Sequence, residues 1–222
     1  MLIDEIILQY NIRAVFFDFD GTLVDTHDVY ISMYTQLFNE FGYSINEDDI
    51  VPLFGLKALD IIKTVTNKST NDIELDKMLM RRKEILAEKY KLARVIDGAF
   101  ELLNYLKSKN LLLAVITSAM LEAVVKINIY VNDILSFFDL VVTADDISET
   151  KPSPKPLLYA SKKLAIPPKQ CLMIGDSIYD ILAAKKAEMR VIGFSSMSQK
   201  KRNELERLAP DYVIDTFREL MS

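Results

Sequence analysis

The chain has 222 residues, of which 50% are apolar and 27% are charged, a composition typical of a globular protein with a full hydrophobic core. Its net charge of −5 argues against a nucleic-acid partner, since polynucleotides bind to basic surfaces. One histidine, His27, and one cysteine, Cys171, exclude an internal disulfide and a zinc site built from several such residues. The ionisable chemistry that remains is that of carboxylates and lysines.

The first ten residues predict a helix with one apolar face, formed by Leu2, Ile3, Ile6, Ile7 and Tyr10. Its polar face carries acids, so we expect it to pack on the core or on a second subunit and not on a membrane. The start of the chain lacks the basic lead of an export signal, and no apolar run reaches the length of a bilayer span. We therefore expect a cytoplasmic monomer or homodimer without a membrane partner, which the single cysteine also favours.

A short apolar run over residues 14–18 predicts a buried strand that ends in two acids, Asp18 and Asp20. In extended backbone, residues i and i+2 point the same way, so both carboxylates face one site. Two ionised acids at this spacing repel each other unless a cation lies between them, and Mg²⁺ is a hard ion that prefers such oxygens. An acid-rich turn at the end of the strand is the alternative interpretation.

Nearly a hundred residues separate this strand from the next one, which is far more than one crossover helix needs. The intervening segment predicts helices over residues 29–41, 58–65 and 73–90, and Met33, Leu37 and Phe41 repeat at helical spacing. We therefore predict a small helical domain inserted over residues 23–93. Residues 1–22 and 94–222 then form the discontinuous main domain.

The rest of the chain alternates β-rich runs with helical stretches, which predicts an α/β fold with a parallel sheet covered by helices. Polar groups follow three of these runs, namely Thr117, Thr143 with Asp145, and Asp176, as Asp18 follows the first strand. Because ligands bind beyond the carboxyl ends of such strands, we expect these groups at one edge of the sheet. The predicted strands after the first are residues 111–116, 140–142, 171–174, 190–194 and 212–214.

A second acidic motif places Asp180 about one helical turn after Asp176, on the same face of the helix. Helix capping by Asp176 or Ser177 is the alternative, but it does not explain a second acid on that face. Three further residues could bind a phosphate: the hydroxyls of Thr117 and Ser118 at a helix start, and Lys151 before a proline-rich turn. Each is a weak signal alone, and Lys155 is interpreted as a surface lysine.

Taken in order, these motifs resemble the four motifs of the haloacid dehalogenase superfamily. The matching residues are Asp18-Phe-Asp-Gly-Thr-Leu-Val-Asp25, Thr117, Lys151-Pro-Ser-Pro, and Gly175-Asp176 with Asp180. The resemblance spans nearly the whole chain, and the insert resembles the helical cap of phosphoglycolate phosphatase-like and pyrophosphatase-like members. It implies a Rossmann-like parallel sheet core and a phosphatase that acts on a small phosphorylated molecule.

The resemblance also implies roles for these residues. Asp18 would be the nucleophile that forms an aspartyl-phosphate, and Asp20 the general acid and base. Thr117 and Lys151 would bind the phosphoryl oxygens. The metal site would hold Mg²⁺ through Asp18, the backbone carbonyl of Asp20 and Asp176, with Asp180 as a further ligand or a neighbour of the ligands.

Several alternatives stay open at this point. Dehalogenases of the superfamily lack the acid at the position of Asp20, which argues against that activity. A phosphosugar mutase similar to β-phosphoglucomutase shares the same residues, and a non-catalytic phosphate-binding module is a third hypothesis. In the predicted cap, Lys57 is a candidate contact for an anionic substrate, with a surface lysine as the equal alternative.

Three other positions carry smaller predictions. Relatives usually have glycine at the position of Glu188, where a helix ends in left-handed backbone, so Glu188 is expected to alter that turn or to reduce stability. His27 is interpreted as an exposed hinge residue, with a place at the substrate entrance as the alternative. Cys171 is expected to fill the core.

Overall fold

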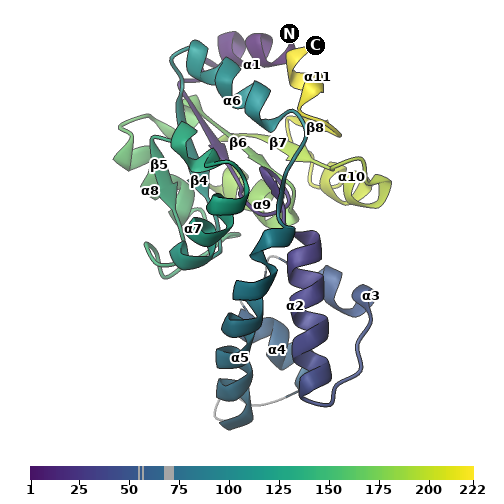
Figure 1. The fold of residues 1–222 in the computed structure, drawn as a ribbon. Coiled ribbons are helices and arrows are strands. Elements are labelled where there is room, and N and C mark those ends of the chain that lie inside the picture. Colours follow the sequence, from purple (N-terminus) through teal and green to yellow (C-terminus); the bar gives the residue numbers. More distant parts are fainter. Residues whose placement is uncertain (55, 57, 68–72) are drawn as a thin grey trace. The chain divides into compact units, whose positions relative to one another are not determined.

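The computed structural model describes residues 1–54, 56, 58–67 and 73–222 and contains a six-stranded parallel sheet (Figure 1). The order of its strands is β5-β4-β1-β6-β7-β8, which confirms the predicted α/β class with a Rossmann-like sheet. The strands are β1 (Ala14–Phe17), β4 (Leu112–Ile116), β5 (Leu140–Val142), β6 (Cys171–Gly175), β7 (Arg190–Phe194) and β8 (Tyr212–Ile214).

The central strands are apolar along their whole length because both faces of the sheet are covered. Every residue of β1 and of β6 is buried. Phe17 of β1 pairs with Val115 on one side and with Ile174 on the other, so the three strands end at nearly the same level. Continuous apolar runs of this kind are typical of parallel strands between two helical layers.

Helices α8 and α9 cover the face of the sheet that carries Ala14 and Phe16. On the opposite face, the ring of Phe17 packs edge-on against Phe138 and Phe217, with centroid distances of 6.0 and 6.4 Å. The part of the chain that contains this sheet also has the helices α1 (Leu2–Tyr10), α6 (Ala99–Ser108), α7 (Leu121–Tyr130), α8 (Lys155–Lys163), α9 (Ile178–Lys186), α10 (Gln199–Glu206) and α11 (Arg218–Met221), with the 3-10 turns η3 (Ile134–Phe137) and η4 (Pro168–Gln170).

The amino-terminal segment forms α1, and this helix packs on the core through Ile3 and Ile6, which are both fully buried. The Tyr105 hydroxyl of α6 donates a hydrogen bond to Asp4 Oδ1 at 2.6 Å, which ties α1 to its neighbour. Of the two packing partners expected for this helix, the structure shows the core. None of the helices in the described part of the chain combines the length and the apolar character that a membrane span needs.

The chain divides into two compact units, residues 1–25 with 95–222, and residues 26–94. It leaves the first unit after β2 (Val24–Asp25) and returns through β3 (Arg94–Val95). In the second unit, α2 packs against α5 around the stacked rings of Tyr34 and Phe38. The described helices there are α2 (His27–Glu40), α3 (Glu47–Ile50), α4 (Ala58–Thr66) and α5 (Ile73–Lys89), with the turns η1 (Val51–Leu53) and η2 (Tyr90–Leu92).

Candidate active site

The strand order creates a topological switch point at the carboxyl ends of β1 and β6. From β1 the chain runs to β4 and β5 on one side, and then to β6, β7 and β8 on the other side. Such a point is where open α/β sheets bind their ligands. Asp18 follows β1 and Asp176 follows β6, and the Asp18 backbone N–H donates to the Ile174 carbonyl at 3.0 Å. These two acids therefore lie at adjacent strand ends.

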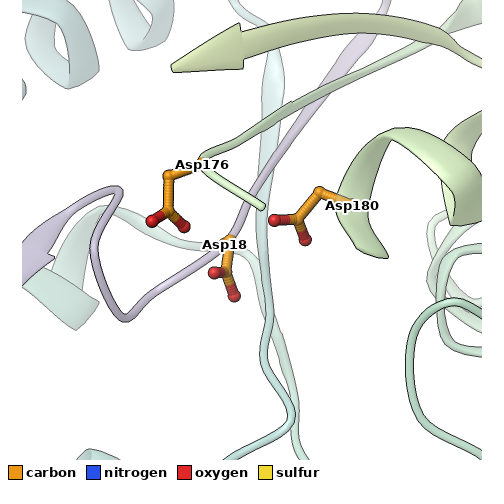
Figure 2. A group of neighbouring side chains, drawn as sticks. All are labelled: Asp18, Asp176 and Asp180. Carbon is orange, nitrogen blue, oxygen red and sulfur yellow. The ribbon is translucent and has the colours of Figure 1, made fainter. Parts of the chain in front are cut away.

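Three carboxylates converge at this point, those of Asp18, Asp176 and Asp180 (Figure 2). One oxygen of each lies within 4.8 Å of the others. Two glycines permit this approach. A Cβ atom on Gly21 (φ +78°) would lie 2.4 Å from Asp176 Oδ2, and one on Gly175 would lie 2.4 Å from Asp180 Cγ. Any larger residue at either position would displace an acid of the cluster.

Lys151 joins two of the acids. Its Nζ donates to Asp18 Oδ1 at 2.6 Å, forms an ion pair with Asp180 Oδ1 at 2.6 Å, and donates to the Ile116 carbonyl at 2.9 Å. The side chains of all three charged residues are at most 10% exposed. The ammonium is therefore fixed in direction, beside the acid predicted to be the nucleophile.

Burial dominates the electrostatics of this group. It raises the pKa of Asp18 well above the usual range; Lys151 opposes the rise, but Asp180 and Asp176 add to it. Burial also acts against the charged form of Lys151, but the carboxylates of Asp18 and Asp180 outweigh it and raise the lysine pKa above its ordinary value. A further cation close to Asp18 would lower its pKa and favour the ionised carboxylate.

Asp180 also takes part in the capping box that begins α9. The Asp180 backbone N–H donates to Ser177 Oγ at 3.2 Å, and the Ser177 backbone N–H donates to Asp180 Oδ2 at 3.0 Å. Ser177 is thus the N-cap, as one of the two sequence interpretations expected. Asp180 is fully buried, and its other oxygen points to Lys151. The capping box therefore positions Asp180, and Asp180 in turn positions Lys151.

Asp176 has two partners that the sequence did not reveal. Thr22, fully buried, donates from Oγ1 to Asp176 Oδ1 at 3.2 Å, and Lys201 of α10 donates from Nζ to Oδ2 at 2.6 Å. Thr22 belongs to the first motif, and its place there is the one sequence feature that could have pointed to a role at the site. Lys201 is one of several basic residues in a polar helix, and nothing in its spacing distinguishes it.

Thr117, one of the predicted phosphate ligands, is buried at the end of β4. Its backbone N–H donates to the Val142 carbonyl at 3.0 Å, and its Oγ1 accepts from the Ala119 N–H at 3.0 Å. Among the described residues the hydroxyl acts as an acceptor, so its proton is available for a ligand. Ser118 and Asp20 are partly exposed in the loops after β4 and β1.

The polar residues after β5 bind their own loop and the start of α7. Asp146 Oδ2 accepts from the Thr143 N–H at 2.8 Å and from its hydroxyl at 2.9 Å, while Asp145 Oδ2 accepts from the Leu121 N–H at the start of α7. These contacts give Thr143 a role in its own loop and Asp145 a role at the start of α7. Of the four strand ends expected at the site, those of β1 and β6 lead into acids of the cluster, and β4 contributes the Ile116 carbonyl that accepts from Lys151.

The remaining single residues lie as follows. His27 begins α2 with its side chain 43% exposed, and its Nε2 lies 2.9 Å from Glu47 Oε1. Cys171 is fully buried in β6, as expected of core filler, and Lys155 is an exposed lysine paired with Glu149. Lys57, the tentative substrate contact, lies outside the described residues.

The donor set fits a hard divalent cation. Asp18, Asp176 and Asp180 supply carboxylate oxygens, the ligands that such ions prefer. With all three ionised, these acids would carry one more negative charge than Lys151 and Lys201 together offset. In a buried site that excess is unfavourable unless a cation balances it.

Comparison with known proteins identifies the family. The family model of haloacid dehalogenase-like hydrolases matches residues 15–194. The chain belongs to this family. A pyrophosphatase PpaX of Oceanobacillus iheyensis is 25% identical over 213 residues, which cover 96% of both chains.

Solved structures of the family share the fold. A haloacid dehalogenase-like protein from Bacteroides fragilis matches with a TM-score of 0.85 at 22% identity, over 94% of this chain and 99% of the other. CbbY from Rhodobacter sphaeroides in complex with phosphate matches with a TM-score of 0.79 at 23% identity, over 94% and 96% of the two chains. The protein is thus a phosphatase of the haloacid dehalogenase-like family, as its motifs predicted.

Proposed function

We propose that the protein is a Mg²⁺-dependent phosphatase that hydrolyses a small phosphorylated metabolite through a phosphorylated Asp18. The observation that carries the proposal is the buried Lys151 ammonium, 2.6 Å from Asp18 Oδ1, beside two further acids at the switch point of the sheet. A structural ion pair needs one acid and one base. The presence of three acids, held close together where glycines leave room for them, is better explained by a site that binds a cation and a phosphoryl group.

In the first step, a carboxylate oxygen of Asp18 attacks phosphorus, and the bond from phosphorus to the leaving oxygen breaks. Asp20 donates a proton to that leaving oxygen. The phosphoryl oxygens are bound by Lys151, Thr117 and Ser118. The Lys151 ammonium offsets the negative charge that develops on these oxygens.

In the second step, Asp20 takes a proton from water, and the water oxygen attacks phosphorus. The bond between phosphorus and Asp18 breaks, which releases inorganic phosphate and restores the carboxylate. Asp18, the Asp20 backbone carbonyl and Asp176 would hold Mg²⁺, with Asp180 beside them. When bound, the ion neutralises the acids and the phosphoryl oxygens so that they can approach one another.

Pyrophosphate is the first candidate substrate, because the PpaX relative, which aligns over 96% of both chains, is a pyrophosphatase. Phosphoglycolate is the second candidate of the same class. We propose that the helical unit acts as the cap expected over residues 23–93, which limits the site to small substrates and excludes bulk water. A Lys57→Ala variant with unchanged substrate preference would remove Lys57 from this scheme. A cytoplasmic location stays a prediction, which one buried cysteine favours.

The mutase remains the alternative enzyme, since it differs only in that the phosphoryl group passes from Asp18 to a sugar. A sugar phosphate incubated with the protein separates the two activities, because the mutase yields an isomer and the phosphatase yields inorganic phosphate. The non-catalytic module has less support, because the acids of the motifs are all present.

The test is hydrolysis of pyrophosphate and a panel of phosphate esters, with and without Mg²⁺. Wild type is compared with Asp18→Asn and with a control, Asp28→Asn, which removes an exposed acid of α2. We expect turnover that requires Mg²⁺, survives in the control and disappears in Asp18→Asn. Equal turnover by Asp18→Asn would overturn the assignment, and an absence of turnover on every compound would favour the mutase or the binding module.

A further inference from the structure

Both carboxylate oxygens of Asp176 have a partner from another part of the chain. Thr22 donates to Oδ1 at 3.2 Å, and Lys201 donates to Oδ2 at 2.6 Å. Thr22 lies in the loop after β1, whereas Lys201 comes from α10, beyond β7. The carboxylate assigned to the cation is therefore already paired with a positively charged side chain.

The position of α10 does not depend on this ion pair. Arg202, the next residue, binds Asp215 Oδ2 at 3.0 Å and donates to the Val213 carbonyl at 3.3 Å, at the end of β8. Ser198 caps the helix by accepting from the Lys201 backbone N–H at 3.3 Å. Lys201 is thus presented to Asp176 by a helix that other contacts anchor to the sheet.

Asp176 also has contacts that fix it without Lys201. Thr22 is fully buried and holds Oδ1, while Gly21 allows the carboxylate to lie against the backbone of the first loop. The Lys201 side chain is 33% exposed, and that of Asp176 is 14% exposed. The ammonium can therefore move into solvent when another cation takes its place at the carboxylate, whereas the Lys151 ammonium, at 5% side-chain exposure, has no such path.

We propose that Lys201 is a built-in competitor for Asp176, which weakens the binding of Mg²⁺ and leaves the carboxylate when the ion binds. This inference rests on the metal site of the proposed function. An ammonium and a divalent ion at one carboxylate oxygen repel each other, so each lowers the affinity of the other. Lys201 in this way sets the Mg²⁺ concentration at which the site fills.

The test is calorimetric titration of the full chain with Mg²⁺ at about 0.15 M salt, where charges on the open surface are largely screened. Lys201→Gln removes the competitor, and Lys200→Gln removes a neighbouring exposed charge of the same helix as a control. We expect the Kd of Lys201→Gln to fall about fivefold, the upper end for a solvent-accessible ion pair. Lys200→Gln and the charge-conserving Lys201→Arg should stay within about twofold of wild type.

A second readout follows the lysine itself. Wild type is treated with an amine-directed reagent with and without Mg²⁺, and modification of each lysine is measured by mass spectrometry. We expect Mg²⁺ to increase modification of Lys201 and to leave Lys200 unchanged. Thermal unfolding without metal shows whether each variant is folded, and the labelling of wild type carries the test if Lys201→Gln does not fold.

The outcomes separate the inference from the metal site. Unchanged or weaker binding by Lys201→Gln would overturn the inference, because Lys201 would then be a spectator or would position Asp176. Unchanged labelling of Lys201 would do the same. If wild type binds no Mg²⁺, or if an Asp176→Asn variant binds Mg²⁺ as tightly as wild type does, the proposed metal site is wrong. The inference about Lys201 then fails with it.

Discussion

Glu188 ends α9 in backbone that favours glycine, with φ at +58°. The Met189 N–H donates to the Ala184 carbonyl at 3.0 Å, and the Glu188 N–H donates to the Lys185 carbonyl at 3.1 Å. These two bonds form a Schellman motif, in which the left-handed residue is usually glycine. The helix end therefore keeps the left-handed turn that glycine favours, so the expected alteration of the turn is not seen and the expected loss of stability stays a prediction.

Glu188→Gly should therefore stabilise the protein. A left-handed conformation costs a residue with a Cβ about 1–2 kcal/mol, and the greater freedom of glycine in the unfolded chain offsets about half of that gain. The carboxylate lost lies 3.7 Å from Lys169, and both side chains are at least 74% exposed, so the pair contributes little. The net expectation is a free energy of unfolding higher by about 0.5–1 kcal/mol, or a Tm higher by about 1–4 °C.

The assay is thermal unfolding followed by far-UV circular dichroism for wild type, Glu188→Gly and Glu188→Ala. The alanine variant removes the same carboxylate but keeps the Cβ, so it should show no comparable gain. If the glycine variant is no more stable than the alanine variant, the turn is not strained and the reasoning is refuted.

Three further predictions concern other parts of the chain. Burial raises the pKa of the Cys171 thiol to about 12, so we expect no thiol labelling of the native protein at about pH 8 and full labelling after unfolding; rapid native labelling would contradict this. Gly175→Ala should displace Asp180, whose Cγ would lie 2.4 Å from the new Cβ, and should lower kcat by at least about tenfold and the free energy of unfolding by about 1–3 kcal/mol; wild-type turnover would show that the cluster tolerates the shift. A hydrogen bond from Ser195 and the ion pair with Arg202 hold the pKa of Asp215 below its usual range. Because the pKa of Asp215 is lower in the folded state than in the unfolded state, its carboxylate stabilises the fold at pH values above the unfolded-state pKa. This stabilisation is lost as the pH falls through the folded-state pKa. The Tm advantage of wild type over Asp215→Asn should therefore shrink from about pH 5 to about pH 3. An advantage independent of pH would mean that the carboxylate charge is not responsible.

Local pattern was enough to locate the sheet, because its strands are buried on both faces and read as continuous apolar runs. Residues 140–142, 190–194 and 212–214 were predicted with the bounds that β5, β7 and β8 have, and the other strands differ by one residue at an end. The predicted helices at 29–41 and 73–90 likewise correspond to α2 and α5. Periodicity identifies such elements because burial of one face or both faces decides which residues are apolar.

The contacts of the site were harder to predict, because they depend on distances between segments far apart in sequence. Asp18 and Asp176 are 158 positions apart and adjacent in space, which strand-end reasoning anticipated. The ion pair of Lys201 with Asp176 depends on where α10 lies, and the local pattern of that helix contains no trace of it. Thr143 and Asp145 stand at a strand end as well, yet Thr143 binds Asp146 of its own loop and Asp145 binds the backbone at the start of α7.

The central claim is that Asp18 carries the phosphoryl group during turnover. Wild type is quenched in acid during hydrolysis of the best substrate, reduced with borohydride to trap an acyl phosphate, and digested for mass spectrometry, beside Asp18→Asn treated in the same way. We predict reduction at Asp18 in wild type only while substrate is being turned over, and at no aspartate in the variant. Sustained turnover without reduction at Asp18, or reduction at another carboxylate, would contradict the mechanism.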